Sequence, residues 1–311
     1  MKIIYRKGCD GICILRCFGY DGQVELPREI HGLPVVELGP YVFSETVRPQ
    51  ATGELYLSDL SEEEEQEAIP SWQDRNGWQE ERDKGNPTGI PNKAADGNRR
   101  QQETDQDKLR CLLSADELPD GTPALKGTAI HALSLPPKLR KIGAYACYNC
   151  GNLEYLGFFS ELKDLGAGLF TGCHRIGRID LHMASSETCC LKEVLAELRQ
   201  TLRVTCLDQQ GNIWAKLLFP EYYEESIENT PARILTQEMH GCGHRYRNAF
   251  NGPDFQYLTY DKLFPHIQVQ EKPELVTELV LGRLMYPIQL KEERKKIYEE
   301  YGSGHGREIL R

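Results

Sequence analysis

The sequence predicts an α+β protein in which a leucine-rich-repeat solenoid, made of parallel β-strands and short coils, is followed by a mostly helical domain with a β-hairpin. Three observations predict this fold. Apolar residues recur at intervals of 23 residues between positions 130 and 183. A polar segment with few aliphatic residues interrupts the chain at 61–110. After residue 184 the apolar residues take the spacing of helices.

Length and charge limit the classes of protein to which the chain can belong. It has 311 residues, a formal net charge of -10 and 40% hydrophobic residues, enough for two domains with cores of their own. Net acidity disfavours binding to nucleic acid or to anionic lipid, and no apolar run approaches the roughly 20 residues that span a bilayer. Charge interrupts the start of the chain before a signal-peptide core forms. We therefore expect a cytoplasmic protein without a nucleic-acid or membrane partner.

The repeat is clearest between Ile130 and Met183. One hexapeptide pattern, with apolar residues at its first, fourth and sixth positions, occurs three times, as Ile130–Leu135, Leu153–Phe158 and Ile176–Leu181. A period of this length with an L-x-x-L-x-L core is typical of a leucine-rich solenoid. The apolar positions are predicted to point into the stack, because one unit cannot bury its apolar face alone.

Other positions keep the same interval. Gly143 recurs as Gly166, where we expect a tight or left-handed backbone, and Cys150 recurs as Cys173, where a small thiol fits under the return loop. The stretch from Leu135 to Leu153, LPPKLRKIGAYACYNCGNL, resembles the BspA-type leucine-rich repeat family, as does the opening Gly22–Phe43. The resemblance covers about a quarter of the chain and implies a solenoid fold. It implies no catalytic residue, and some members of the family bind other proteins.

The polar segment separates two blocks of repeats. Residues 1–60 are predicted to form an N-terminal cap and the first repeat units, with a strand near Glu54–Leu57, and residues 111–184 the later units. The composition of 61–110 predicts a long flexible loop, because it cannot offset the entropy of ordering. Trp72 and Trp78 lie in it, either as a short recognition motif or packed loosely back on the solenoid.

Residues 185–311 are predicted to form the mostly helical domain. A helix is expected from Ser185 or Ser186 through Leu202, and a hairpin from Arg203–Leu207 and Asn212–Phe219 around a turn. Pro220 is predicted to begin an acidic helix. Further helices are expected at Tyr257–Phe264, Pro273–Met285 and Leu290–Tyr301. The last residues, from Arg307, are expected to start another helix.

Three clusters of residues carry potential chemistry, and each has a structural alternative. Cys147 and Cys150 have C-x-x-C spacing without the second pair that a zinc site needs. Cys9, Cys13 and Cys17 are predicted to lie on one face of an end-cap strand, with an iron–sulfur triad as the alternative. The eleven cysteines, an odd number, are expected to be reduced. His240, Cys242 and His244 form the densest cluster, either a metal or nucleophile site or a tight loop.

The sequence contains no Walker loop, H-E-x-x-H or G-x-S-x-G motif, and we expect a protein that is not an enzyme and has no cofactor. The predicted function is protein–protein interaction through the exposed strand face of the solenoid. The residues predicted to bind the partner are His131, Ser134, Glu154, Tyr155, Arg178 and Asp180. The alternative is an enzyme or metal protein with its site in the His240–His244 loop and the solenoid as a targeting arm. A purely structural scaffold is a third possibility.

Overall fold

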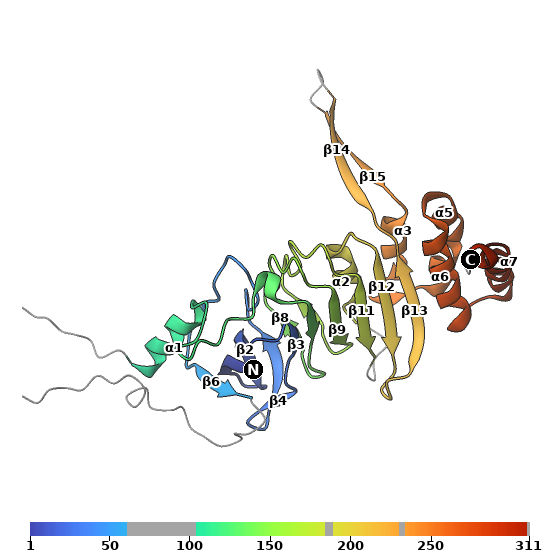
Figure 1. The fold of residues 1–311 in the computed structure, drawn as a ribbon. Helices are drawn as coiled ribbons and strands as arrows, with labels where there is room; N and C mark the ends of the chain where they lie inside the picture. Colours follow the sequence, from blue (N-terminus) through green and yellow to red (C-terminus); the bar gives the residue numbers. More distant parts are fainter. Residues whose placement is uncertain (61–103, 184–188, 230–233, 310–311) are drawn as a thin grey trace, which may run out of the picture.

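The structure is a computed structural model that describes residues 1–60, 104–183, 189–229 and 234–309. The predicted solenoid architecture is confirmed. Successive turns of chain lie side by side between an N-terminal cap and a group of helices, and one hairpin projects from the helical end (Figure 1). In the described part, no helix is both long and apolar enough to cross a membrane.

One sheet carries the repeated hexapeptides. In spatial order, its strands are β3 (Gln23–Glu25), β7 (Ala132–Ser134), β9 (Tyr155–Phe159), β11 (Arg178–His182), β12 (Leu202–Leu207) and β13 (Ile213–Phe219). All neighbours are parallel except the last pair. Leu133 pairs with Leu156, which pairs with Ile179. This buried row is the one that the sequence predicts, and Val24 and Val204 extend it at its two ends.

The second sheet closes the other side of each turn. Its strands, in spatial order, are β10 (Asp164–Leu165), β8 (Lys141–Ile142), β5 (Leu33–Leu38), β2 (Ile12–Phe18), β1 (Lys2–Lys7) and β6 (Tyr56–Asp59), and β4 (Glu29–Ile30) pairs with β5. Leu38, Ile142 and Leu165 lie in register on three parallel strands. Inward side chains of both sheets share one apolar core, so water is excluded along the whole stack.

The two repeat blocks are consecutive turns in space. Val24 pairs with Leu133 although the polar segment lies between them in sequence. The register is lost in sequence because β6, residues 61–103 and a further helix come between the two turns in the chain. The helix α1 (Asp105–Leu113) begins inside the segment predicted to be a loop, with Thr104 and Asp107 forming a capping box. Trp72 and Trp78 lie outside the described residues.

Close approach between turns explains the repeated glycines. A Cβ atom on Gly166 would lie 2.2 Å from the backbone nitrogen of Ala144, and one on Gly143 would lie 2.4 Å from that of Pro40. The expectation of a tight position is therefore met, but the left-handed residues in these turns are others, Tyr41, Tyr145 and Gly168 among them. Both repeated thiols serve the stacking, since the Cys150 thiol donates to the Phe43 carbonyl (3.3 Å) and the Cys173 thiol to that of Cys147 (3.0 Å).

The N-terminal cap corrects one prediction about cysteines. Cys13 and Cys17 both lie on β2, but they face opposite sides, because a bulge at Leu15 reverses the alternation of the strand. Cys17 joins the solenoid core, whereas Cys13 joins a smaller cluster that buries Leu109 and Leu113 of α1. Cys9 is exposed outside the strands.

Parallel pairing extends beyond the predicted boundary at residue 184, because β12 pairs with β11. The intervening helix α2 (Leu191–Glu197) is shorter than predicted: its C-cap Leu198 is already extended, and Leu202 is in β12. The predicted hairpin is confirmed as β12 and β13. The acidic helix predicted from Pro220 is wrong, since that segment forms β14 (Tyr223–Asn229) and pairs with β15 (Ile234–His240). Cross-strand pairing with a β-favouring partner segment overrides its helical pattern.

The remaining helices pack at the end of the solenoid formed by β13 (Figure 1). They are α3 (Gly243–Arg247), α4 (Tyr257–Lys262), α5 (Phe264–Gln270), α6 (Pro273–Met285) and α7 (Glu292–Ile309), with β16 (Phe250–Asn251) and β17 (Asp254–Phe255) between α3 and α4. The helix predicted at Pro273–Met285 has those bounds. Residues 307–309 continue α7 rather than start a new helix. A buried bidentate pair of Arg283 with Asp261 (2.8 and 3.0 Å) joins α6 to α4.

Candidate functional site

The candidate site is the solvent side of the sheet that contains β7, β9, β11 and β12, which we call the outer face. Alternation along each strand produces it, since Leu133, Leu156 and Ile179 point into the core and their neighbours point out. The strands face the viewer in Figure 1, with the helices at the β13 end of the sheet. Parallel pairing in register arranges the outward residues in three rows.

The rows differ in chemistry. The first contains Ala132, Tyr155, Arg178 and Arg203; the second Ser134, Gly157, Asp180 and Thr205; and the third Phe159, His182 and Leu207. Arg178 and Arg203 are exposed. The outer face thus has a cationic side, a polar middle and an aromatic side. This combination of aromatic, arginine and polar groups is typical of protein-binding surfaces.

Tyr155 lies along the sheet rather than away from it. Its hydroxyl donates to Oδ2 of Asp180 at 3.0 Å. The ring has room because the adjacent residue is Gly157, whose Cβ would lie 2.9 Å from the Tyr155 hydroxyl oxygen. Burial, followed by the nearby Asp180 carboxylate, raises the pKa of Tyr155 to about 12. The hydroxyl therefore stays protonated at neutral pH and holds the middle of the outer face in one arrangement.

The aromatic side is built by Phe159 and His182. Their rings stack with centroids 4.6 Å apart and an interplanar angle of 21°. Burial lowers the pKa of His182, although the Asp180 carboxylate acts in the opposite direction. A neutral imidazole on a phenyl ring presents a half-buried, mainly apolar surface beside Leu207. This part of the outer face favours an apolar contact.

The cationic side includes one fixed arginine. Arg203 forms a bidentate pair with Glu278 of α6, with its Nε and Nη2 at 2.6 and 2.9 Å from the two carboxylate oxygens. This pair ties the last parallel strand to the helical end. Arg178, one strand earlier in the same row, is the more central of the two cations.

Four of the six predicted binding residues lie on the outer face: Ser134, Tyr155, Arg178 and Asp180. His131 and Glu154 instead directly precede β7 and β9, where their carbonyls accept backbone hydrogen bonds from the next turn. Glu154 also pairs with Arg175 (2.6 Å), which fixes it at the turn. Phe159 and His182 were missed. Continuing the alternation by two residues from Gly157 and Asp180 would have identified them.

The His240–His244 cluster does not converge on one point. His240 stacks on Tyr223 and lies 3.1 Å from Glu225, whereas the His244 ring packs near Tyr222. Cys242 is buried, and burial followed by the nearby Glu271 carboxylate raises its pKa to about 12. Among the residues that the structure describes, no group of three His, Cys, Asp or Glu side chains could hold a metal ion. The metal alternative therefore gains no geometric support.

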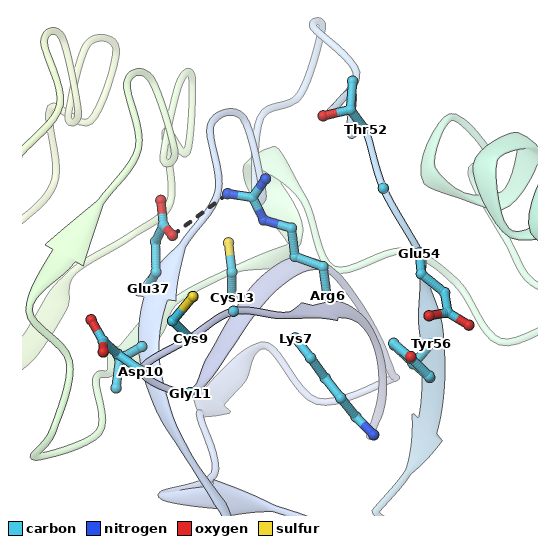
Figure 2. A pocket seen from close by; sticks show the side chains of 13 residues that line it. Arg6, Lys7, Cys9, Asp10, Gly11, Cys13, Glu37, Thr52, Glu54 and Tyr56 are labelled. Atoms are coloured by element: carbon cyan, nitrogen blue, oxygen red, sulfur yellow. Dashed lines mark ion pairs between the residues drawn. The ribbon is translucent and has the colours of Figure 1, made fainter.

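A shallow hollow of about 440 Å³ lies on the other sheet, at the turn between β1 and β2 (Figure 2). Arg6 pairs across it with Glu37 (3.6 Å), and the Lys7 ammonium lies 4.5 Å from the centre of the Tyr56 ring. Cys13 lines it, but burial, followed by the Glu37 carboxylate, raises its pKa to about 11. That thiol is protonated at neutral pH, so it is a poor nucleophile.

The C-x-x-C pair has a structural role. Cys147 and Cys150 are both buried, and the pKa of Cys150 is raised, first by its contact with Cys147. A buried, protonated thiol that donates to a backbone carbonyl is typical of packing rather than of redox exchange.

Comparisons with protein-family models, curated proteins and solved structures found no match to this chain.

Proposed function

We propose that this protein is a non-catalytic interaction module that binds a protein partner through the outer face. We also propose that its turns are leucine-rich repeats of the BspA type, which the interval of 23 residues and the repeated glycine and cysteine positions support. One observation carries the functional proposal. The outward residues of four parallel strands form a registered surface with Arg178, a Tyr155–Asp180 hydrogen bond and a Phe159–His182 stack.

The physical argument is preorganisation. A binding surface costs less free energy to use when its side chains are already ordered. Tyr155 and His182 are held by contacts within the sheet, and the sheet is held by the core beneath it. The partner expected from this chemistry places an acidic group near Arg178 and an apolar side chain near Phe159.

A matched pair of charge reversals tests the proposal. Arg178→Glu changes the outer face, and Lys141→Glu makes the opposite sheet equally more acidic. The full chain serves as bait, and the affinity of each recovered protein is then measured by titration. We expect Arg178→Glu to weaken binding at least tenfold, because central arginines are common hot spots.

The control decides how the result is read. Lys141→Glu should leave the affinity of the same partner unchanged, and circular dichroism should show that both variants fold. Equal affinity for the wild type and Arg178→Glu would contradict the proposal. So would equal weakening by both variants, since net charge alone would then explain the loss.

A further inference from the structure

Among the elements that the structure describes, β14 and β15 form a hairpin whose strands pack mainly against each other. The two strands form a sheet of their own, in which Tyr223 pairs with His240 and Glu225 with Glu238. Figure 1 shows them leaving the solenoid near α3 and pointing away from the body. We call this hairpin the arm. An isolated two-stranded hairpin is at best marginally stable in water, so we expect an arm of this length to have further stabilising contacts.

The arm exposes large apolar side chains. Tyr223, Leu235 and Met239 are 56%, 71% and 43% exposed. Leu235 and Met239 lie on one face of the arm and Tyr223 on the other, where its ring stacks on His240 with centroids 4.7 Å apart. Both faces therefore offer apolar area, and both strands leave an unpaired edge. Exposed apolar patches and unpaired strand edges of this kind are typical of interaction sites.

The formal charges in the two strands of the arm have one sign. The two strand sequences, YEESIEN and ILTQEMH, contain four glutamates and neither lysine nor arginine. Glu225 is directly opposite Glu238 on the same face. Like charges in directly opposed positions destabilise a strand pair. The pair of opposed glutamates therefore destabilises the arm, and a cationic group of another molecule placed beside them would reduce their repulsion.

The base of the arm is held firmly. Buried Arg247 of α3 donates to the carbonyl of Pro220 before β14 and to that of Gly243 after β15. It also donates to three carbonyls around the last solenoid turn, those of Leu195, Leu198 and Gln200. This one guanidinium joins both ends of the arm to the solenoid.

Tight packing adds to this anchor. A Cβ atom on Gly243 would lie 2.0 Å from the Pro220 carbonyl oxygen, so the two ends of the arm approach as closely as backbones can. Arg199 beside them pairs with Glu224 at 3.1 Å. The arm thus has a fixed base and a free, acidic and apolar outer part.

We propose that the arm is a second docking element, independent of the outer face, and that it binds a partner protein whose surface places Lys or Arg side chains around an apolar recess. Charge complementarity selects this occupant. The Tyr223 ring, which lies on the same face of the arm as Glu225 and Glu238, fills the recess, and cations of the partner face the two glutamates. A second copy of the chain fits less well, because it would bring more glutamates to the same place.

The test combines crosslinking with titration of the full chain. A photo-reactive amino acid replaces exposed Thr236 on the arm, and crosslinked residues on any captured protein are mapped by mass spectrometry. The captured protein is then purified and titrated with wild type and with Glu225→Gln/Glu238→Gln. Removing the repulsion between the two glutamates should raise the melting temperature of the chain. The same change should weaken the affinity for the captured protein at least tenfold. Opposite effects on folding and binding cannot arise from misfolding.

Two further measurements sharpen the test. Tyr223→Ser should also weaken binding, and raising the salt concentration should weaken it for the wild type more than for the double variant. Glu299→Gln/Glu300→Gln on exposed α7 has the same change in net charge and should leave affinity unchanged. The proposal is overturned by equal weakening in this control, by crosslinks only to a second copy or to acidic surfaces, or by no crosslinked protein. Arg178→Glu distinguishes the two docking elements, because this variant should still form the crosslinks from position 236 on the arm.

Discussion

The solenoid and the arm both consist of β-strands, but they are stabilised in different ways. In the solenoid each strand is covered by the next turn, thiols and glycines repeat, and the same backbone hydrogen bonds recur from turn to turn. The arm has no neighbouring turn, and its position depends on one buried guanidinium with five carbonyl partners. The solenoid is thus stabilised by many equal, local contacts, whereas the arm relies on a few unequal contacts between distant residues.

The largest expected effect concerns the anchor of the arm. Arg247→Met should lower the free energy of unfolding by about 4 kcal/mol, because it leaves five carbonyls without their charged donor. Denaturant titration of both proteins gives the difference. Loss of less than about 1 kcal/mol would show that solvent or other donors replace the guanidinium, and the contrast between the two regions would disappear.

The solenoid core should respond almost as strongly to a cavity. Leu156→Ala removes the centre of the buried row between Leu133 and Ile179 and should cost about 3 kcal/mol in unfolding free energy. Tyr155→Phe, one residue earlier on the outer face, removes a single hydrogen bond and should cost about 1 kcal/mol. Equal losses in the two variants would contradict the assignment of inner and outer sides.

The close approach between turns predicts an intermediate effect. Gly166→Ala should cost about 2 kcal/mol, because the new methyl group must push two backbone segments apart. Gly151→Ala is the matched control, since nothing lies within 4 Å of its Cβ position. Thermal unfolding of the two variants compares them directly. A control that loses as much stability as Gly166→Ala would rule out steric packing as the cause.

A second buried arginine tests whether burial alone makes an arginine important. Arg16 on β2 is fully buried, yet among the residues that the structure describes its Nε and Nη2 have no hydrogen-bond partner, while Nη1 donates to the Val42 carbonyl at 3.2 Å. Burial, followed by the Arg48 charge, lowers the pKa of Arg16. Arg16→Met should therefore change the unfolding free energy by less than about 1 kcal/mol, far less than Arg247→Met. A loss as large as that of Arg247→Met would refute this ranking.

The smallest expected effect is a pH dependence from the outer face. Because the pKa of His182 is lowered in the folded state, the unfolded chain takes up the proton first as pH falls. The contribution to stability is thus fully present above the unfolded pKa of about 6.5 and decreases below it. His182→Phe should lose less stability than the wild type between about pH 7 and about pH 5. Identical pH profiles would show that His182 does not contribute.

The periodic parts of the fold were the predictable ones. The row of Leu133, Leu156 and Ile179 followed from one interval, because each turn repeats the environment of the previous one. Helix α6 was predictable to the residue, since Pro273 marks its start and the apolar spacing continues to Met285. The outer face was predicted in part, as Ser134, Tyr155, Arg178 and Asp180. His131 and Glu154 were misplaced because the strands begin one residue later.

The sequence by itself determined that turns of equal length stack and which side chains they bury, because each repeat contacts only its neighbours and carries its own pattern. Only the tertiary structure decided that the first turn joins the later ones directly, that Tyr223–Asn229 is a strand, and that Arg247 anchors the arm. Those outcomes depend on contacts between residues far apart in the chain. No local pattern encodes such contacts, since their free energy exists only once both partners are in place.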